Sequence, residues 1–370
     1  MESFVPVRKG TTPRKMHADL DGLKDDELGR NGFVGRSTQL YRQHDPTAFR
    51  TSGPLAGGFF LSSALTPTDH DDPEGDPLDL YANDDCRLAL SRRSLPMPFY
   101  VRNVDGDELW FVHRGTGRFE TELGPLSYRP GHYVYIPKAT TYRHVPDDGE
   151  NHLLVLETRA ELRVPEAGVL GRHHPFDAGL ADLPEPQPLE GPHRIRLTHE
   201  RSYPGQHTWL DYDHDPCDAV GWVGDNLPFA FHIDDYDVLT SATVHLAATA
   251  HLFLQAEGVA VMHFLPRPAE SRPGVERTPW YHRNVDYDEI AFFHDGSMFG
   301  IDMPPGLVQH APQGIHHGAP ERAREHARKH FDEYDRVEWA IVSVDTRQRM
   351  VPSAAVRAAA GLDTSAEVTA

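Results

Sequence analysis

The stretch YHRNVDYDEIAFFHDG at residues 281–296 has a close counterpart earlier in the chain, YVRNVDGDELWFVHRG at residues 100–115. The two copies agree at 10 of 16 positions, whereas residue frequencies near one in twenty would give about one match. Each copy passes from a polar segment ending in Glu into mostly apolar residues, and then reaches a turn glycine, Gly115 or Gly296. This order is typical of a β-strand that enters a tight hairpin. The repeat therefore predicts two related β units.

Short strand-like runs surround both copies, at spacings close to the ~8–12 residues of sandwiches and barrels. They lie at residues 118–123, 126–136, 219–223, 237–246, 251–255 and 259–264. Helix signals are few, and the clearest follows Pro320, where Ala323 and Ala327 recur at helical spacing. We therefore expect an all-β fold of two small barrels with few helices.

A proline-rich segment separates the two copies. Because proline removes donors from a strand ladder, its prolines predict a connection rather than sheet; they are Pro175, Pro184, Pro186, Pro188 and Pro192. We expect an N-terminal domain with an N-terminal arm at residues 1–159, a connection at 160–205, and a C-terminal domain that carries the functional site at 206–370.

Composition excludes several classes of protein. The 370 residues carry a formal charge of -20 at pH 7, which disfavours nucleic acid and anionic membrane surfaces as partners. No apolar run approaches the ~18 residues of a membrane span, and the basic N-terminus is followed by no signal-peptide core. The two cysteines, Cys86 and Cys217, form no CxxC motif. We expect a cytoplasmic protein whose metal, if any, is held by His and carboxylate.

The second copy of the repeat opens a possible metal site. It reads H-x-N-x4-E-x6-G from His282 through Glu289 to Gly296, which resembles the first motif of the cupin superfamily, with Asn284 in place of that motif's second histidine. Further on, Gly306 to His317 reads G-x5-P-x-G-x2-H and resembles the second cupin motif. The ligands would be His282, Glu289 and His317, two imidazoles and one carboxylate, as in the facial triad of non-haem Fe(II) oxygenases.

Two alternatives stay open at this stage. Asp288 could be the carboxylate ligand, although Glu289 stands as far before Gly296 as Glu108 stands before Gly115. In the first copy Val101 takes the place of His282, and Tyr142 takes the place of His317. Because Glu108 alone cannot hold a metal, the N-terminal domain is predicted to be metal-free, although His132 and His144 could form a different site there.

With these residues placed, the chain resembles the homogentisate 1,2-dioxygenase family over most of its length. The segments that carry the resemblance are VRKGTTPRKMH (7–17), GFVGRSTQLYRQHDPTAF (32–49), DPCDAVGWVGDNLPFAF (215–231), PWYHRNVDYDE (279–289) and PQGIHHGAP (312–320). The resemblance implies a bicupin of two double-stranded β-helix (jelly-roll) barrels with one Fe(II) in the C-terminal barrel. It further implies a homo-oligomer, either a trimer, a hexamer or a dimer, and a substrate that chelates iron through a ring hydroxyl and a carboxylate before the ring opens.

The chain departs from the family at positions expected in the substrate pocket. Val223, Ala311 and Met298 stand where the family tends to have polar groups, and Asn284 completes this pocket set. The apolar character of Val223, Ala311 and Met298 favours a ring that carries an apolar substituent. His316 and His310 lie in the ligand loop and are candidates for the missing catalytic group, although neighbours on a strand face opposite sides.

The resulting expectation is an Fe(II)-dependent ring-cleaving dioxygenase that takes O2 and a small aromatic acid, either homogentisate or a substituted relative. Two other functions are compatible with the residues. One is a bicupin that binds a metal or small ligand without turnover, and the other is a cupin isomerase or decarboxylase that uses Mn(II) or Ni(II). Arg283 lies beside His282 and is a candidate partner for the substrate carboxylate, although strand alternation turns it away from the metal face.

Overall fold

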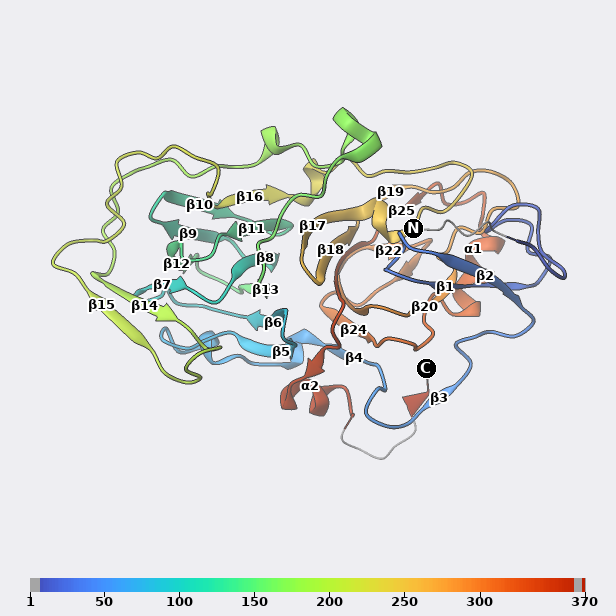
Figure 1. Cartoon of the computed structure of the whole chain (residues 1–370), viewed down its shortest axis with the longest axis horizontal. Helices are drawn as coiled ribbons and strands as arrows, with labels where there is room; N and C mark the ends of the chain where they lie inside the picture. Colours follow the sequence, from blue (N-terminus) through green and yellow to red (C-terminus); the bar gives the residue numbers. More distant parts are fainter. Residues whose placement is uncertain (1–6, 363–367, 370) are drawn as a thin grey trace.

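The computed structural model describes residues 7–362 and 368–369. Figure 1 shows two β-rich lobes side by side along the longest axis, the first in teal and the second in orange. The described part of the chain holds two α-helices, α1 (Glu321–Lys329) and α2 (Ala354–Ala359). This arrangement confirms the expected all-β bicupin fold, and α1 begins directly after Pro320.

The first barrel consists of two facing sheets. One sheet has the order β10 (Gly124–Tyr128), β9 (Gly117–Thr121), β12 (Thr141–Pro146), β7 (Tyr100–Asn103), β14 (Arg194–Thr198) and β15 (Thr208–Asp211). The other has the order β16 (Phe229–His232), β11 (His132–Ile136), β8 (Asp107–Arg114), β13 (His152–Thr158), β6 (Cys86–Ser91), β5 (Leu78–Ala82) and β27 (Val351–Pro352).

The second barrel has one large sheet and a smaller one. The large sheet has the order β17 (Leu252–Ala256), β18 (Val259–Phe264), β26 (Ala340–Thr346), β21 (Asp288–Asp295), β24 (Leu307–Ala311) and β4 (Gly58–Leu61). The smaller sheet is β2 (Ser37–Arg42), β1 (Lys24–Gly29) and β20 (Tyr281–Asn284). Three two-stranded ladders complete the described strands: β19 (Arg267–Pro268) with β25 (Arg336–Val337), β22 (Ser297–Met298) with β23 (Ile301–Asp302), and β3 (Arg50–Thr51) with β28 (Val368–Thr369).

The repeat seen in the sequence forms the same pair of strands in each barrel. The first copy supplies β7 and β8, and the second supplies β20 and β21. Both long strands end at the glycines expected to turn the chain, and Gly115 and Gly296 have φ angles of 93° and 87°. Only glycine adopts this left-handed conformation without a steric cost, so the hairpins form where the sequence places them.

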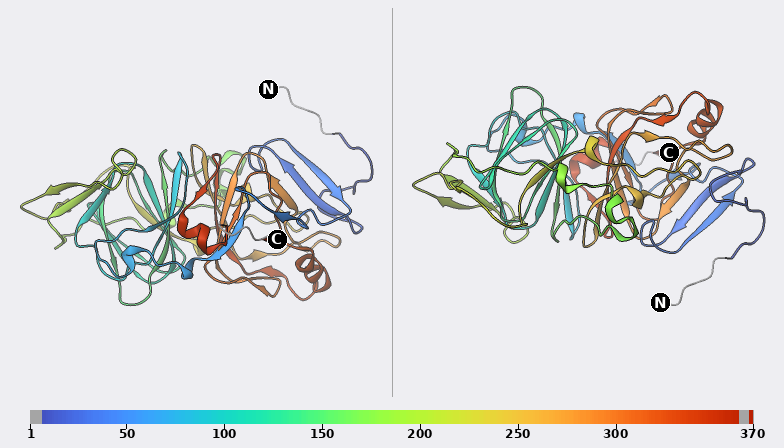
Figure 2. Two further views of the ribbon diagram at one scale, coloured as in Figure 1. Left: turned by 90° about the horizontal axis from the view of Figure 1, so that it is seen from below. Right: turned by 90° about the horizontal axis from the view of Figure 1, so that it is seen from above.

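Strand pairing departs from the domain boundaries suggested by the sequence. β1 and β4 come from the first 159 residues but pair with β20 and β24 of the second barrel; Figure 2 shows the blue N-terminal strands beside the orange lobe. Conversely, β15 and β16 follow residue 205 but pair with β14 and β11 of the first barrel. β14 lies inside the expected connection, because the prolines end at Pro192 and the strand begins at Arg194. Two predicted strands, 219–223 and 237–246, are irregular.

A continuous core joins the two barrels. Leu109 and Phe111 of β8 and Ile290 and Phe292 of β21 belong to one buried cluster. The intervening residues of each strand turn into their own barrel, where Trp110 joins a separate cluster. Both faces of β8 and β21 are therefore buried, and the two repeat copies meet back to back.

Neither α1 nor α2, the two α-helices of the described residues, is long and apolar enough to cross a bilayer.

Candidate metal centre

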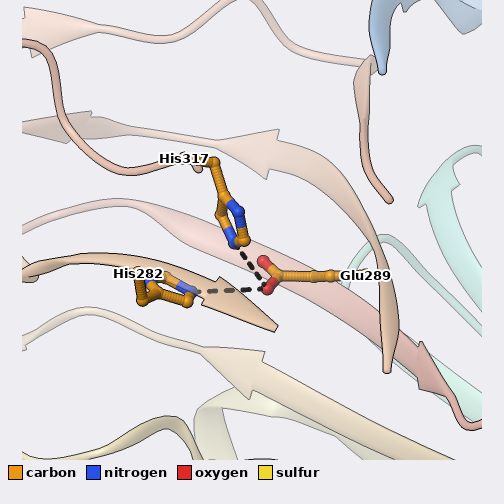
Figure 3. A group of neighbouring side chains, drawn as sticks. All are labelled: His282, Glu289 and His317. Atoms are coloured by element: carbon orange, nitrogen blue, oxygen red, sulfur yellow. Dashed lines mark hydrogen bonds and ion pairs between the residues drawn. The ribbon is translucent and has the colours of Figure 1, made fainter. Parts of the chain in front are cut away.

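Three side chains converge inside the second barrel. His317 Nε2 lies 3.2 Å from Glu289 Oε2, and His282 Nε2 lies 3.8 Å from the same oxygen. Figure 3 shows both imidazoles directed at the carboxylate. One ligand atom from each residue fits within 4.8 Å of the others, and this is the one such group of three in residues 7–362 and 368–369. The structure thus brings together the three residues that the sequence motifs suggested.

Backbone hydrogen bonds hold His282 and His317 side by side. His282 N donates to His317 O at 3.1 Å, and His317 N donates to His282 O at 2.9 Å. The ring centroids lie 4.0 Å apart. In each ring Nδ1 donates to a carbonyl two residues earlier, that of Trp280 at 3.2 Å or Ile315 at 3.1 Å. With Nδ1 bonded to a carbonyl, Nε2 is the nitrogen of each ring that is left to bind a metal, and it faces the centre of the group.

Glu289 is oriented by the residue that replaces the second cupin histidine. Asn284 Nδ2 donates to Glu289 Oε2 at 3.1 Å, and Asn284 is 6% exposed. The amide cannot supply a strong metal ligand, but it holds the carboxylate in place, as partners of metal ligands commonly do. Asn284 therefore lies at the site.

The charges at the site favour cation binding. Burial works against an ionised Glu289, but the attraction of the two imidazoles outweighs it and holds the pKa of Glu289 well below its usual range. Burial and the neighbouring His317 lower the pKa of His282. For His317 burial acts in the same direction, but the hydrogen bond to Glu289 prevails and raises its pKa. Because metal ligands must be deprotonated, a bound metal ion would replace the hydrogen bond between His317 and Glu289.

One unsatisfied atom supports this interpretation. His282 Nε2 is buried and has no hydrogen-bond partner, although buried polar atoms are nearly always paired. The edge of Phe33, from the loop between β1 and β2, packs against this imidazole with ring centroids 5.3 Å apart. A metal ion would satisfy the free nitrogen, and Phe33 would shield it from water. The residues present therefore fit a metal ion.

Asp288, the alternative carboxylate ligand, is engaged elsewhere. It is 1% exposed and accepts hydrogen bonds from the backbone N–H groups of Gln313 and Met350, both at 2.8 Å. His310 Nε2 lies 3.2 Å from it and so joins Asp288 rather than the centre. His310 pairs with Ile290, whereas Ala311 pairs with Glu289, so His310 faces the opposite side of the sheet. The structure does not bring His310 to the site as a catalytic candidate.

His316 also points away from the centre, although it adjoins His317. Its Nε2 lies 3.1 Å from Asp26 Oδ2 and 2.6 Å from Arg283 Nη1. Arg42 pairs with the same carboxylate at 2.5 Å. His316 and Arg283 therefore belong to an ion-pair cluster on the other face of β20, and strand alternation explains the placement of Arg283.

Of the expected pocket positions, the structure places Ala311 at the site and two others away from it. Ala311 is 4% exposed and lies opposite Glu289 on the same face. Val223 is 100% exposed, in a segment that Trp222 joins to the proline-rich connection through a hydrogen bond to Pro184 O. Met298 is buried with Ala323 and Ala327 beneath α1. It follows the far end of β21, roughly 20 Å of strand beyond Glu289 at ~3.3 Å per residue.

The first barrel has counterparts of Asn284 and Glu289 but not of the two histidines. Asn103 Nδ2 donates to Glu108 Oε1 at 2.9 Å, as Asn284 does to Glu289. Burial raises the pKa of Glu108, although hydrogen bonds from Tyr142 and Asn103 oppose this effect. Val101 supplies no ligand atom. The carboxylate and its amide remain, but both imidazoles are replaced.

Sequence reasoning missed Phe33, which lies in a segment quoted only for its resemblance. The ring contacts His282 because β1 pairs in parallel with β20, with Glu27 opposite His282. No local pattern identifies such a long-range partner. The separation of the N-terminal strands from β20 by about 250 residues of sequence hides it.

Part of the chain is similar in sequence to a known family of proteins. Residues 92–233 match the family described as "Homogentisate 1,2-dioxygenase N-terminal". Homogentisate 1,2-dioxygenase of Pseudomonas putida is 27% identical over 243 residues, which cover 62% of this chain and 54% of that protein. The chain is thus similar to members of the homogentisate 1,2-dioxygenase family. Its match spans about half the length of these homogentisate 1,2-dioxygenases.

A second relative matches the chain along nearly its whole length. A protein of Saccharolobus solfataricus named "Putative dioxygenase" is 26% identical over 367 residues, which cover 93% of each chain. Among solved structures, a salicylate 1,2-dioxygenase from Pseudaminobacter salicylatoxidans covers 82% of this chain and 87% of its own, at 13% identity and a TM-score of 0.37. A cupin 2 barrel protein from Leptotrichia buccalis covers 78% and 95%, at 10% identity and a TM-score of 0.36. Because these TM-scores are low, the fold assignment depends on the strand order given above.

Proposed function

We propose that this chain is an Fe(II)-dependent dioxygenase that opens the ring of a hydroxylated aromatic acid, homogentisate or a substituted relative, with O2. The observation that carries the proposal is the convergence of His282, Glu289 and His317 with both Nε2 atoms turned inward. Two imidazoles and one carboxylate match the facial triad of non-haem Fe(II) oxygenases. The relationship to homogentisate 1,2-dioxygenases supports the same reaction class.

In this proposal His282, Glu289 and His317 hold the iron. The bound metal would offer open positions where the oxygens of a chelating substrate and O2 can meet. The chain's own residues prepare that position. Trp280 O and Ile315 O fix the tautomers of the imidazoles, Asn284 orients Glu289, and Phe33 keeps water from one side of His282.

The proposed substrate pocket is apolar near the carboxylate ligand. Ala311 faces the same side of the sheet as Glu289, and Phe33 lies over His282. An apolar ring substituent buried there would contribute about 0.8 kcal/mol per methylene. This supports a substituted aromatic acid as well as homogentisate. The support comes from Ala311 and Phe33, because Val223 and Met298 lie away from the site.

The test is O2 uptake by anaerobically Fe(II)-reconstituted enzyme with homogentisate, gentisate, and alkyl- or methoxy-substituted homogentisates. We expect uptake that depends on both Fe(II) and the diphenol, with a ring-opened product. Bound metal with no uptake on any of these acids would point to a bicupin that binds without turnover. Activity restored by Mn(II) or Ni(II) without O2 would point to an isomerase or decarboxylase.

We also propose a cytoplasmic homo-oligomer: a trimer, a hexamer or a dimer. Support for the location is that Cys86 and Cys217 are both buried as free thiols, which is usual in reducing compartments. Light scattering on the purified protein determines the oligomer, and a monomer at working concentration would contradict it.

A further inference from the structure

The two barrels meet through equivalent positions of the sequence repeat. Phe111 on β8 and Phe292 on β21 are separated by 181 residues, as are His113 and His294. The phenylalanine rings lie 6.3 Å apart, and the cross contacts are nearly equal: Phe111 to His294 is 5.0 Å, and His113 to Phe292 is 5.1 Å. Reciprocal contacts of this kind are the mark of a two-fold axis. The lobes are therefore related by an approximate two-fold axis that passes between β8 and β21.

Two imidazoles face each other beside this axis. His113 Nδ1 and His294 Nδ1 lie 3.0 Å apart. A metal ion with nitrogen bonds of 2.0–2.1 Å holds two neighbouring ligands about 2.9–3.4 Å apart, depending on whether the angle is near 90° or tetrahedral. The separation of the two nitrogens already falls within that range, so a metal ion could bind both after the rings turn their Nδ1 atoms from each other toward a common point.

Open space adjoins the pair. A cavity of about 500 Å³ is lined by both histidines and by residues from each barrel: Arg114, Gly115, Pro130, Glu150, Asp295 and Pro305. It offers room for an ion with water in its remaining positions. Glu150 and Asp295 contribute negative charge to the cavity, whereas Arg114 contributes one positive charge. The chain as a whole is acidic, which favours the approach of a cation.

Both rings are ready to act as ligands near neutral pH. Burial, with repulsion from His152 and His294, lowers the pKa of His113 to about 2. Burial also lowers the pKa of His294 to about 4. Neither ring must lose an excess proton to bind a metal. In the pair as it stands one Nδ1 donates to the other, and metal binding would move that hydrogen to Nε2 of the same ring.

We propose that His113 and His294 form a second metal site, between the two barrels, for a divalent transition metal of the zinc, nickel and copper class. Such ions bind imidazole nitrogen more tightly than Fe(II) does. The iron content of the enzyme therefore stays at one per chain, and the second site takes a different metal. An ion held by one ligand from each barrel would stabilise the contact between the lobes, because it binds the folded state alone.

The experiment uses the full chain stripped of metal and dialysed against Zn²⁺ alone. We expect two Zn²⁺ per chain in the parent and one in His282→Ala/His317→Ala, which lacks the first site. Adding His294→Gln to that variant should remove the last Zn²⁺. Adding His144→Gln instead, at a buried histidine inside the first barrel, should leave it bound. Zn²⁺ should raise the melting temperature of His282→Ala/His317→Ala but not of the His294→Gln triple variant.

Anomalous scattering from Zn²⁺-soaked crystals of His282→Ala/His317→Ala provides a readout that does not change the cavity. The expected peak lies about 2.0–2.1 Å from both Nδ1 atoms. Three results would overturn the proposal: no Zn²⁺ in this variant, a peak elsewhere, or unchanged binding after His294→Gln. If His294→Gln does not fold, His113→Asn replaces it in the same test.

Discussion

His282 and His317 exchange two backbone hydrogen bonds, of 3.1 and 2.9 Å, across a separation of 35 residues in the sequence. The contact joins the segment after β24, which carries His317, to β20, which carries His282. The Cα atoms of the two histidines are therefore neighbours. The rings then need little side-chain freedom to meet Glu289, because each Nδ1 is also bonded to a carbonyl. The geometry of the site is therefore set largely by the backbone, which is how a precise ligand set is best supported.

Asn284→Ala tests whether the amide supports the carboxylate. Loss of its hydrogen bond to Glu289 should weaken Fe(II) affinity roughly 10–100-fold, as loss of such partners commonly does, while the fold survives. Competition with a chelator measures the affinity. Asn103→Ala, at the equivalent position of the first barrel, is the control and should leave iron affinity unchanged. Equal effects of the two substitutions would mean that Asn284 acts only on the fold.

Asp288→Asn and Glu289→Gln separate the two candidate carboxylates. Asp288 accepts from two backbone N–H groups and His310, so its substitution should lower the free energy of unfolding by about 1–3 kcal/mol and keep the iron. Glu289→Gln should lose the iron. Iron analysis and denaturant unfolding measure both. The reverse pattern of iron loss would identify Asp288 as the ligand.

His310→Gln should behave as a structural change. The imidazole lies 5.0 Å from Tyr81 and contacts Asp288, on the face of β24 away from Glu289. We expect a loss of stability of about 1–3 kcal/mol, with iron content and kcat near those of the parent. A drop in kcat of ~100-fold or more at full iron occupancy would restore His310 as a catalytic group.

Phe33→Ala opens one side of the centre. Without the ring, water and chelators reach His282, so iron should be lost to a chelator roughly 10-fold faster, at the low end of effects around metal sites. Phe33→Leu keeps an apolar cover and is the control. Unchanged release in Phe33→Ala would show that the ring does not shield the site.

His263 makes stability depend on pH. It is fully buried, neither nitrogen has a partner, and burial lowers its pKa to about 3. The unfolded chain takes up this proton near pH ~6.5, so stability is complete above that pH and falls as the pH drops toward 3. Between about pH 6 and 4, the free energy of unfolding should fall less steeply with decreasing pH in His263→Leu than in the parent. The expected difference in slope is about 1 kcal/mol per pH unit. His214→Gln, at an exposed site, is the control, and an unchanged slope in His263→Leu would contradict the assignment.

Local sequence carries much of the fold. The strand pairs at 100–115 and 281–296 and the glycine turns follow from patterns of a few residues. The proposed ligands follow from spacing, because two short motifs place His282, Glu289 and His317 in order. Contacts between residues far apart in the sequence leave no local pattern and could not be predicted. Examples are the pairing of β1 and β4 with the second barrel and the contact of Phe33 with His282.

Of the pocket residues inferred from the family resemblance, the structure places some at the site and others away from it. Ala311 and Asn284 lie on short, regular strands next to the ligands and are found at the site. Val223 lies in an irregular, exposed segment that Trp222 joins to Pro184 through a hydrogen bond, and Met298 follows a turn that carries it beneath α1. His310 adjoins Ala311 on β24 and points to the other side of the sheet, and His316 adjoins His317 but bonds to Asp26, so a neighbour in the sequence need not share the site.

The central claim is that His282, Glu289 and His317 hold one iron, and the most direct measurement is the iron content of three purified variants. His282→Ala, Glu289→Ala and His317→Ala should each fold, as circular dichroism would show, and contain almost no iron beside a parent with about one per chain, because a triad that loses a ligand holds the metal too weakly to survive purification. Iron near one per chain in any of the three variants would contradict the account.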